Sequence, residues 1–503
     1  MADTTPSFIS VNDPGQRAVI AAIAAVIHTK GVKAFIAGGF IRDTLLKLPV
    51  CDLDVAVSGD TASLITDLAD KLGSACFALD EGAGMFRITL PAGGAFSQVD
   101  IGDAWGTMEE DLARRDFTID ALACPLENFD IATGELPVID PRGGMRDLEK
   151  RLIRAVSPDV FQKDPARLLR AVRLAAELRF TIEPATEVAI TADAESVANV
   201  AGERTREELV RLLSLPSTGA VFEYLDRLSL LTRIFPELEP SRGVDQPKEH
   251  TWDVLGHQLK TVSSLDWVLR RGDWSYAMPE AKSIIPWDAS TAAYFESPLN
   301  GGTTRLALTR LAALIHDIAK PETKVLAPNG RVRFYGHAGR GAVTAQEMLK
   351  RLRFSQKETK FVAAMVESHM RPNQMGPEAI LPTPKAVYRY LRDTGEAAVA
   401  TLYLSLADHL AARGPTLSLD NFREHVTIVN YVLAERGRQL EKSRTPRLLT
   451  GTDLQSRLGL RPGPEMGTIL TAAGEAQATG EISTPEEAIE FARRLIERGA
   501  NGS

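Results

Sequence analysis

The sequence has few of the features that mark exported, disulfide-linked or membrane-bound proteins. Its 503 residues include only three cysteines, Cys51, Cys76 and Cys124, and none of them belongs to a CxxC pair. An odd count without paired spacing argues against a disulfide framework and fits a reducing compartment. The most apolar early run, residues 18–27, is too short to span a bilayer, and there is no signal-peptide pattern. We therefore expect a cytoplasmic protein without a membrane anchor.

An excess of positive charge is also missing. The net charge is −8, so the chain as a whole does not have the composition of a nucleic-acid-binding protein. Basic residues nevertheless gather in two stretches. Residues 142–179 hold ten basic and five acidic side chains, and residues 331–357 hold seven basic and one acidic. Such stretches suit binding to a phosphate backbone, although solvated helix faces have the same composition.

The chain is too long for one hydrophobic core, and we expect two to four domains. No internal repeat or low-complexity segment is present. The first 155 residues are rich in strand patterns, and from Asp164 onward helical spacing dominates, with no strand pattern until about residue 330. The expected strands are 32–37, 50–57, 86–90 and 98–101, and the expected helices include 11–30, 40–48, 166–178, 206–214 and 219–229.

Two later segments interrupt the helical pattern. Residues 262–303 are rich in Trp, Ser, Pro and Gly, which predicts an insertion or a long loop. Residues 441–467 carry prolines and glycines and are predicted to be a connector. Beyond them, residues 463–499 predict two helices, the second with Thr484 as its N-cap before Pro485.

The motif DLD at 52–54 is the first candidate for chemistry. Asp52 and Asp54 are two residues apart on a predicted strand, so both carboxylates face the same side. Two adjacent carboxylates with substrate phosphates are the ligands that Mg²⁺ takes in phosphoryl-transfer sites. Asp100, at the end of SQVDI, is the expected third carboxylate, with Asp103 as the alternative. On its own, DLD could equally be the polar edge of a strand.

The motif GGFIRD at 38–43 precedes this strand. Gly38 and Gly39 follow a predicted strand and open a helix, where backbone N–H groups can approach phosphate oxygens. Arg42 lies one helical turn further and could contact a triphosphate, and Asp43 could position the turn. A tight turn without a ligand is the alternative.

Two further motifs carry paired charges. In RRDFTIDA, Arg114 and Arg115 suit phosphates and Asp116 suits ribose hydroxyls, unless the three form a surface salt-bridge cluster. In DPARLLRAVR, Asp164 and Arg167 lie three residues apart at a predicted helix start. A carboxylate can accept from the exocyclic amine of cytosine or adenine while a guanidinium donates to the ring nitrogen, so this pair could select C and A without a template. The alternative is an N-cap followed by a solvated arginine.

Residues 31–215 resemble the class II tRNA nucleotidyltransferases, the family of CCA-adding enzymes and bacterial poly(A) polymerases. The resemblance rests on ordered motifs: GGFIRD, DLD, RRDFTIDA, DPRGG (140–144), DPARLLRAVRLAAEL (164–178) and AGERTREEL (201–209). It implies catalytic carboxylates that bind Mg²⁺, and substrates that are tRNA, CTP and ATP. The implied site residues are Asp52, Asp54 and Asp100 for catalysis, and Gly38, Gly39, Arg42, Arg114, Arg115, Asp116, Asp164, Arg167 and Arg170 for the nucleotide.

The sequence departs from this family at two motif positions. Lys163 stands where the family often has Glu, and Asp120 stands where it usually has Asn. Neither change removes a group that the expected chemistry needs, but both bear on which bases are added.

A second constellation lies in the helical half of the chain, which contributes four of the eight histidines to it. Mixed imidazole and carboxylate ligands suit transition metals. GHQLKT, LAALIHDIAKP, YGHAGRGA, ESHMRP and LSLADHL resemble the HD phosphohydrolase superfamily. The resemblance implies a metal site, with Mn²⁺ or Ni²⁺ as candidates and His250 as the substitute if His257 is misassigned. The expected ligands are His257, His316, Asp317, His337, His369 and Asp408.

We expect an α+β protein: an N-terminal nucleotidyltransferase head with a mixed sheet and helices at 1–155, then an all-α neck at 156–240, an HD domain at 241–415 and a tail at 416–503. The expected function is template-independent addition of C and A to the 3′ end of tRNA, with a second, phosphohydrolase site. Poly(A) addition, A-only addition, or a phosphohydrolase with an RNA-binding N-terminal half remain alternatives.

Overall fold

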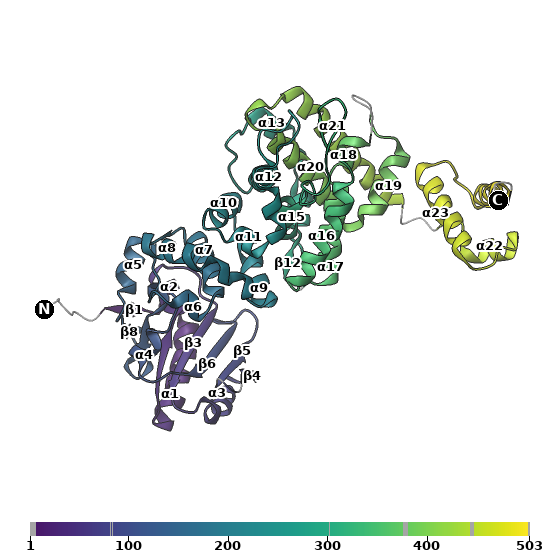
Figure 1. Ribbon diagram of the computed structural model, residues 1–503. Coiled ribbons are helices and arrows are strands. Elements are labelled where there is room, and N and C mark those ends of the chain that lie inside the picture. The colour runs from purple at the N-terminus through teal and green to yellow at the C-terminus, as the bar shows by residue number, and fades with distance from the viewer. Residues whose placement is uncertain are drawn as a thin grey trace. The chain divides into compact units, whose positions relative to one another are not determined.

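A six-stranded sheet is the centre of the first part of the chain. In the computed structural model, which describes residues 7–80, 82, 84–300, 302–375, 381–442 and 447–500, its strand order is β4-β5-β6-β3-β2-β7. β3 and β6 run parallel and the other neighbouring pairs are antiparallel, so the sheet is mixed, as the sequence predicts (Figure 1). The strands are β2 (Lys33–Ala37), β3 (Asp52–Ser58), β4 (Cys76–Asp80), β5 (Met85–Thr89), β6 (Gln98–Asp103) and β7 (Ala123–Pro125).

The two faces of this sheet differ because side chains alternate along each strand. Three apolar side chains of β3 are buried on one face, whereas Asp52, Asp54 and Ala56 share the other. Helix α4 (Met108–Leu112) packs on the second face, where Leu112 joins Ala56 in a buried cluster. The buried side chains of β3 on the first face are Leu53, Val55 and Val57.

Helices predicted from the sequence surround the sheet. α1 (Pro14–Lys30) begins after Asp13, whose side chain accepts a hydrogen bond from the Gln16 N–H, and α2 (Gly39–Leu45) ends before Pro49. α7 (Ala166–Leu178) has the predicted bounds. The other elements of this part are β1 (Phe8–Ser10), α3 (Ile65–Leu72), β8 (Glu135–Pro137), α5 (Gly144–Lys150), β9 (Leu152–Ile153), α6 (Val160–Lys163), β10 (Thr181–Ile182) and α8 (Pro184–Asp193).

The chain divides into two compact units. The first comprises Met1–Val200 and Leu228–Arg233, and the second comprises Ala201–Arg227 and Ile234–Ser503. The second unit is mainly helical, and its first helices are α9 (Gly202–Leu213), α10 (Gly219–Arg227), α12 (Val254–Val268), α15 (Arg305–Ile315), α16 (His337–Arg351), α17 (Gln356–Ser368), α18 (Arg371–Gln374), α19 (Pro384–Thr394), α20 (Ala398–Arg413) and α21 (Leu419–Lys442).

A buried ion pair lies inside the second unit. The Arg310 guanidinium on α15 is 2.6 Å from the Asp266 carboxylate on α12, and both side chains are almost fully buried. Arg310 also donates to the backbone carbonyls of Leu213 and Leu215, while Asp266 accepts from the Thr218 N–H. The pair therefore joins α12 and α15 to the loop that connects α9 with α10.

The prediction of a long loop at 262–303 is wrong. α12 extends to Val268, and two further helices follow, α13 (Pro279–Ile284) and α14 (Ala289–Glu296), before β11 (Pro298–Asn300) and β12 (Thr303–Thr304). Trp287 stacks on Phe295 with ring centroids 6.2 Å apart and meets Tyr403 of α20 edge-on. The aromatic residues of the segment thus form its packing contacts with a distant helix, which no local periodicity reveals. The short strands β10, β11 and β12 were also not predicted, because they lie in a region where the sequence shows no strand pattern.

The C-terminal region contains three helices instead of the predicted connector and two helices. α22 (Gly451–Leu458) lies within 441–467, and α23 (Pro464–Thr479) and α24 (Pro485–Ala500) follow. Thr484 accepts from the Glu487 N–H, which confirms the predicted N-cap. Residues 443–446 of the predicted connector lie outside the described residues. The three helices share a core centred on Leu454, Ile469, Ala473, Ala476, Ala488 and Ala492.

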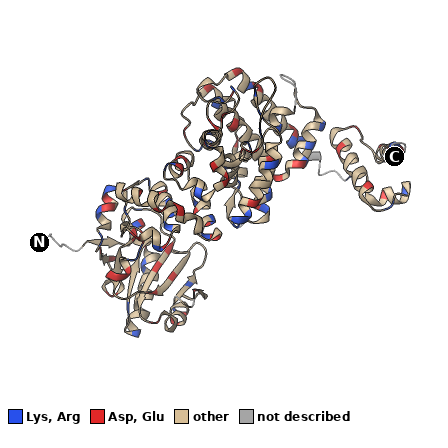
Figure 2. Cartoon of the chain, in the orientation of Figure 1, with Lys and Arg blue, Asp and Glu red and all other residues tan. Residues whose placement is uncertain are grey.

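Charges of both signs are interspersed through both units (Figure 2). Within the described ranges, no helix combines the length and the hydropathy that crossing a membrane requires.

Candidate functional sites

The carboxylates of DLD lie opposite the expected third carboxylate. In the parallel pairing of β3 with β6, Asp54 is the register partner of Asp100, and Asp52 is the partner of Gln98. Because directly opposed residues share a face, Asp54 and Asp100 lie side by side. Burial and the neighbouring Asp100 raise the pKa of Asp54 from 3.8 to about 6. Arg115 opposes this rise without cancelling it, so a divalent cation bound here would stabilise the ionised pair.

Arg87 contacts Asp100 and was missed by the sequence analysis. It is the register partner of Asp100 on β5, and its Nε and Nη2 atoms donate to the two carboxylate oxygens at 2.6 and 2.7 Å. A lone arginine in a strand carries no signal that separates this role from solvent exposure. The alternative third carboxylate, Asp103, accepts instead from the Thr61 N–H at 2.9 Å. Asp103 therefore caps a turn, which favours Asp100.

The Gly38-Gly39 turn borders these carboxylates. Gly38 has φ 77°, in the left-handed region that favours glycine. A Cβ atom at this position would lie 3.5 Å both from the Asp54 Oδ2 atom and from the Arg115 Nη1 atom. The turn therefore lies between a catalytic candidate and a phosphate-binding candidate.

Arg42 has carboxylate partners on all three of its nitrogen atoms. Its Nε and Nη2 atoms donate to Asp43 at 2.8 and 2.9 Å, and its Nη1 donates to Asp120 at 2.6 Å. Burial raises the pKa of Asp120, and the Arg42 charge opposes that rise. The departure from the usual Asn thus places a second carboxylate on Arg42. This arrangement suits Arg42 to holding the α2 turn, whereas a direct triphosphate contact requires it to exchange a partner.

The RRD motif is fixed by three different contacts. Arg114 lies over the exposed Trp105 ring at 4.1 Å, Arg115 pairs with Asp111 at 3.1 Å, and Asp116 pairs with Arg170 of α7 at 2.8 Å. Arg167 donates to the backbone carbonyl of Arg114 at 3.0 Å. The start of α7 is therefore joined to the RRD motif through Arg167 and Arg170.

The expected base-reading pair lies at the start of α7. The Arg167 Nε atom is 3.7 Å from the Asp164 Oδ2 atom, and Asp164 Oδ1 accepts from the Ala166 N–H. Asp164 has extended backbone geometry and the helix begins at Ala166, as predicted. The structure brings the two side chains together while each also has a local structural contact.

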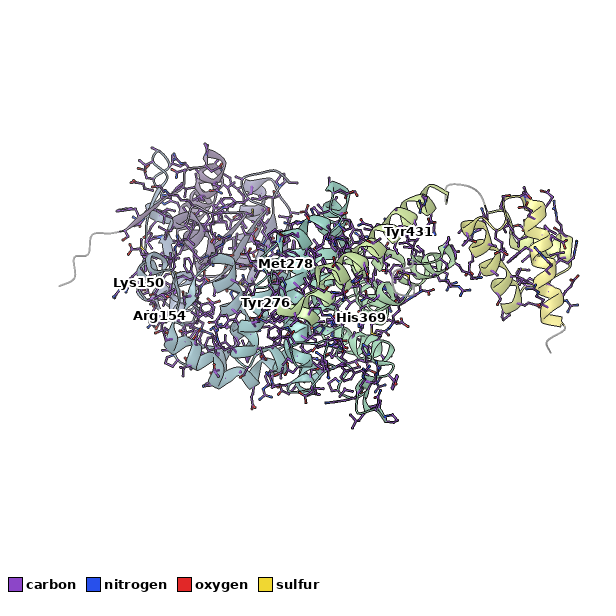
Figure 3. All side chains as sticks on the ribbon, turned by 90° about the horizontal axis from the view of Figure 1, so that it is seen from above. Lys150, Arg154, Tyr276, Met278, His369 and Tyr431 are labelled. Atoms are coloured by element: carbon purple, nitrogen blue, oxygen red, sulfur yellow. The ribbon has the colours of Figure 1, made fainter. Side chains whose placement is uncertain are left out.

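In the second unit, all six expected HD residues converge. His257 Nε2 lies 3.2 Å from His316 Nε2 and 3.0 Å from Asp408 Oδ1. Asp317 lies between the histidines: its Oδ2 is 3.1 Å from His316 Nε2, and its Oδ1 is 3.3 Å from His337 Nε2 and 3.6 Å from His369 Nε2. Among the described residues, two subsets could hold a metal ion: His257, His316 and Asp408, and His316, Asp317 and His369. Five of the six side chains are buried and Asp408 is partly exposed; Figure 3 labels His369 among the helices of the second unit.

The histidine rings are oriented as metal ligands are. The Nδ1 atoms of His316, His337 and His369 lie 2.7–2.9 Å from backbone carbonyls three residues earlier, which leaves each Nε2 facing the cluster. Asp317 Oδ1 and His337 Nε2 are buried and, although 3.3 Å apart, form no hydrogen bond with each other or with another described residue. Unsatisfied buried atoms of this kind are costly unless a ligand binds them, so the donor set fits a transition metal.

The carboxylates of the cluster favour positive charge beside them, which a bound metal ion would supply. Burial alone would lower the pKa of His316, but Asp317 and Asp408 raise it to about 10. Besides protonated His316, Lys320 places a positive charge in the cluster, with its Nζ atom 2.6 Å from Asp317 Oδ2. The substitute ligand His250 is not part of either metal-ligand subset, and its ring lies 5.2 Å from that of His257. His257 is therefore the better-placed ligand.

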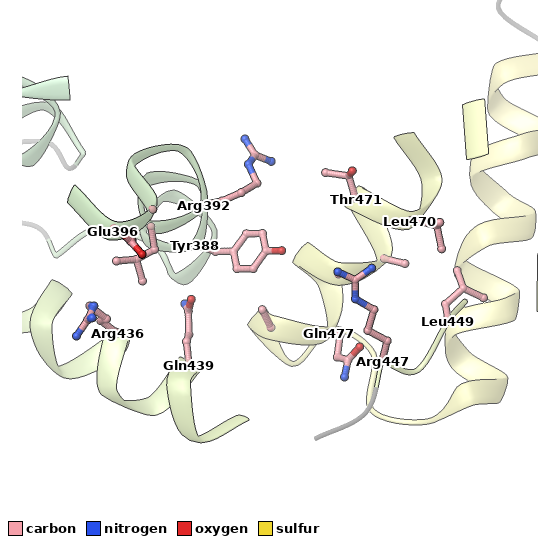
Figure 4. Close-up of a pocket in the computed structure, with 15 residues that line it drawn as sticks. Tyr388, Arg392, Glu396, Arg436, Gln439, Arg447, Leu449, Leu470, Thr471 and Gln477 are labelled. Carbon is pink, nitrogen blue, oxygen red and sulfur yellow. The ribbon is translucent and has the colours of Figure 1, made fainter. Parts of the chain in front are cut away.

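A separate cavity of about 810 Å³ lies in the C-terminal region, between α19, the end of α21 and α23 (Figure 4). Arg392, Arg436, Arg447 and Tyr388 are among its lining residues. It contains none of the residues expected from the sequence to carry chemistry.

Family models match three parts of the chain. Residues 90–154 match the poly A polymerase head domain, and residues 179–241 match the probable RNA and SrmB-binding site of polymerase A. Residues 337–492 match the putative domain 2 of tRNA nucleotidyltransferases.

Curated relatives extend the similarity to almost the whole chain. The A-adding tRNA nucleotidyltransferase of Deinococcus radiodurans is 34% identical over 92% of this chain and 96% of its own length. The chain belongs to the tRNA nucleotidyltransferase family. Within this family, the CC-adding enzyme of Thermus thermophilus is 33% identical over 91% of the chain, and the multifunctional CCA protein of Nitrosococcus oceani is 31% identical over 64%. Nucleotidyltransferases of this kind use divalent metal ions.

Solved structures of the family show the same fold. A CCA-adding enzyme in complex with ATP has a TM-score of 0.64 at 19% identity and covers 97% of this chain. The Thermotoga maritima CCA-adding enzyme complexed with tRNA has a TM-score of 0.60 at 20% identity, also over 97% of the chain. The expected α+β architecture, with a mixed-sheet head and a helical remainder, is confirmed.

Proposed function

We propose that this tRNA nucleotidyltransferase adds C and A to the 3′ end of tRNA from CTP and ATP, without a nucleic-acid template. The observation that carries the proposal is the opposition of Asp54 and Asp100 across β3 and β6, in a chain of this family. The terminal ribose hydroxyl of the tRNA attacks the α-phosphate, and pyrophosphate leaves. Family membership also argues against the alternative in which the first unit only binds RNA.

Asp52, Asp54 and Asp100 would hold magnesium. In a two-metal site the ions supply activation of the attacking hydroxyl and neutralisation of the leaving group. Arg115 lies beside the Gly38 turn and next to Asp54, where its guanidinium can bind a phosphate of the nucleotide. Asp116, held by Arg170, is the expected ribose contact.

Base choice is assigned to Asp164 and Arg167. With Asp164 accepting from the exocyclic amine and Arg167 donating to the ring nitrogen, C and A are bound, while U and G would face unpaired groups. Because Arg167 donates to the backbone carbonyl of Arg114, the proposed base-reading pair is joined to the RRD motif.

Addition of A alone is the second candidate. The observation that favours it is that relatives adding only part of the CCA end cover more of the chain: an A-adding enzyme covers 92% at 34% identity and a CC-adding enzyme 91% at 33%, whereas the multifunctional CCA protein covers 64%. Poly(A) addition is a further alternative within the family.

One assay separates these functions. Purified protein is given three tRNA transcripts, which end at the discriminator base, after C and after CC, with each labelled nucleoside triphosphate in turn. A CCA-adding enzyme extends all three to one defined end. An A-adding enzyme extends only the CC transcript, and a poly(A) polymerase produces a long tail. Incorporation of U or G by the parent would contradict the base-reader assignment.

We further propose that the histidine–aspartate cluster is a metal-dependent phosphohydrolase site acting on phosphorylated or cyclic ends of RNA. Its support is the buried, oriented donor set and the unsatisfied Asp317 Oδ1 and His337 Nε2 atoms. His257, His316, Asp317 and Asp408 would hold a transition metal such as Mn²⁺ or Ni²⁺, and His337 and His369 would hold a second metal or the substrate phosphate.

The test is hydrolysis of 2′,3′-cyclic and 2′-phosphate substrates with Mn²⁺, Ni²⁺ or Co²⁺ added after chelation, together with the metal content of the protein. His316→Ala with Asp317→Ala should lose both hydrolysis and metal while retaining nucleotide addition. The matched Asp52→Ala protein should hydrolyse normally and add no nucleotide. Hydrolysis that survives the double substitution would refute the assignment.

A further inference from the structure

A basic hairpin without carboxylates stands next to the histidine–aspartate cluster. From residue 323 to residue 346 the chain has no Asp or Glu, although it carries Lys324, Arg331, Arg333 and Arg340. β13 (Lys324–Leu326) and β14 (Val332–Phe334) pair antiparallel within this stretch, and α16 begins three residues later at His337. The hairpin therefore leads directly into the cluster.

One face of the hairpin contacts the cluster through Phe334. The Phe334 carbonyl oxygen lies 2.8 Å from His337 Nδ1, and the Lys320 Nζ atom lies 5.4 Å from the centre of the Phe334 ring. Lys320 in turn binds Asp317. The orientation of β14 is thus fixed by residues of the cluster.

The other face presents cations and an aromatic ring to solvent. Within β14, Arg333 lies on the face opposite to Val332 and Phe334, because side chains alternate along a strand. Arg331 and Tyr335 flank the strand on either side, and both side chains are exposed, as that of Arg333 is. Arg333 is the register partner of Val325, which is 47% exposed, and Tyr335 is 69% exposed. The result is an exposed row of two guanidiniums and a phenol ring that ends two residues before His337.

These cations are not neutralised. Among the described residues, no carboxylate forms an ion pair with Arg331 or Arg333, whereas the nearby Arg340 pairs with Glu322 at 2.9 Å. Unpaired guanidiniums alternating with an exposed aromatic ring and apolar side chains are the chemistry of single-stranded nucleic-acid binding, in which cations contact phosphates and rings stack on bases.

We propose that Arg331, Arg333 and Tyr335 bind a single-stranded RNA segment and direct its phosphorylated 3′ end to the histidine–aspartate cluster. This inference rests on the proposed hydrolytic function and deepens it: the substrate is the end of a polynucleotide, and not a free nucleotide. The absence of acidic side chains between Glu322 and Glu347 removes the repulsion that would otherwise oppose a phosphate backbone.

The kinetic test compares two substrates with the same reacting group. One is a short RNA with a 2′,3′-cyclic phosphate end, and the other is the corresponding cyclic mononucleotide. Arg331→Ala with Arg333→Ala should lower kcat/KM for the RNA at least tenfold and leave the mononucleotide unchanged, and Tyr335→Ala should act in the same direction. Arg340→Ala, whose cation is already paired, is the matched control. Equal reduction on both substrates, or no reduction on either, would overturn the proposal.

A second test measures RNA affinity and does not depend on hydrolysis. With a 3′-phosphorylated RNA, log Kd should depend less steeply on log salt in the double variant, by roughly 0.7 for each phosphate that the variant no longer binds. A 3′-hydroxyl RNA of the same length controls for binding elsewhere on the protein. If the parent hydrolyses nothing but the slope changes, the hydrolytic function fails and the RNA surface stands. If RNA binding is unchanged, the surface serves another partner, such as a protein, and the inference is wrong.

Discussion

Asp54→Asn should stabilise the first unit while abolishing nucleotide addition. In the absence of metal, the folded protein keeps Asp54 beside Asp100 and raises its pKa from 3.8 to about 6. A shift of about two pKa units corresponds to roughly 3 kcal/mol of strain in the ionised form, since each unit is about 1.4 kcal/mol. Asparagine has the same shape without the charge, so this strain disappears.

The pH dependence has a defined sign. A raised carboxyl pKa means that the folded state binds the proton more tightly than the unfolded state does. This contribution to stability is present below pH 3.8 and is lost as the pH rises through about 6. The difference in the free energy of unfolding between Asp54→Asn and the parent should therefore be small near pH 4, increase between pH 4 and 6, and reach its maximum by pH 7.5. For a unit of about 200 residues, the full stability difference corresponds to roughly 6–12 °C in Tm.

The assay is thermal unfolding in a chelator between pH 4 and 8, with hydrogen exchange in β3 and β6 to assign the transition to the first unit. Asp52→Asn is the control, because Asp52 is exposed and its substitution should remove activity without the same gain in stability. Added Mg²⁺ should raise the Tm of the parent and not that of Asp54→Asn. A variant that is equally stable or less stable than the parent at pH 7.5 without metal would refute the electrostatic argument.

Three other substitutions test separate features of the structure. Arg167→Ala should lower discrimination against UTP and GTP roughly tenfold or more, since an unpaired polar edge costs about 1–3 kcal/mol, and single-nucleotide incorporation measures this. Arg87→Met should lower the Mg²⁺ concentration needed for half-maximal activity, because Arg87 donates to both carboxylate oxygens of Asp100. Titration of Mn²⁺ binding measures the same gain in metal affinity without turnover. Arg310→Ala should cost about 3–5 kcal/mol by leaving Asp266 buried and unpaired, and Arg310→Met with Asp266→Leu should recover much of that stability in denaturant unfolding.

The sequence predicted elements whose signals are local. α7 has an amphipathic repeat that begins after Pro165, so its position could be read directly from the sequence. The six residues of the histidine–aspartate cluster could be predicted as a set because their types and order carry a pattern. The position of Asp100 beside the DLD strand could be anticipated because both segments are recognisable strands, while its role as third carboxylate stays a prediction.

Features that depend on distant partners could not be predicted. Arg87 acquires its role only when β5 and β6 pair, and Arg42 acquires its third carboxylate contact from Asp120, 78 residues away. The segment 262–303 lacks periodicity because its aromatic rings pack against Tyr403 of another helix. Each of these depends on tertiary contacts, which a sequence pattern does not encode.

The pairing of β3 with β6 has a consequence for altering the protein. Asp54 meets Asp100 through the parallel register of β3 with β6, and the turn between β5 and β6 takes no part in that pairing. Gly93 lies at the exposed tip of that turn, so a peptide tag or fluorescent reporter inserted there should leave the enzyme active. Deleting one residue within β6 ahead of Asp100 would instead turn that carboxylate to the opposite face of the sheet. Tolerance to insertion and intolerance to deletion should thus lie only a few residues apart in the chain.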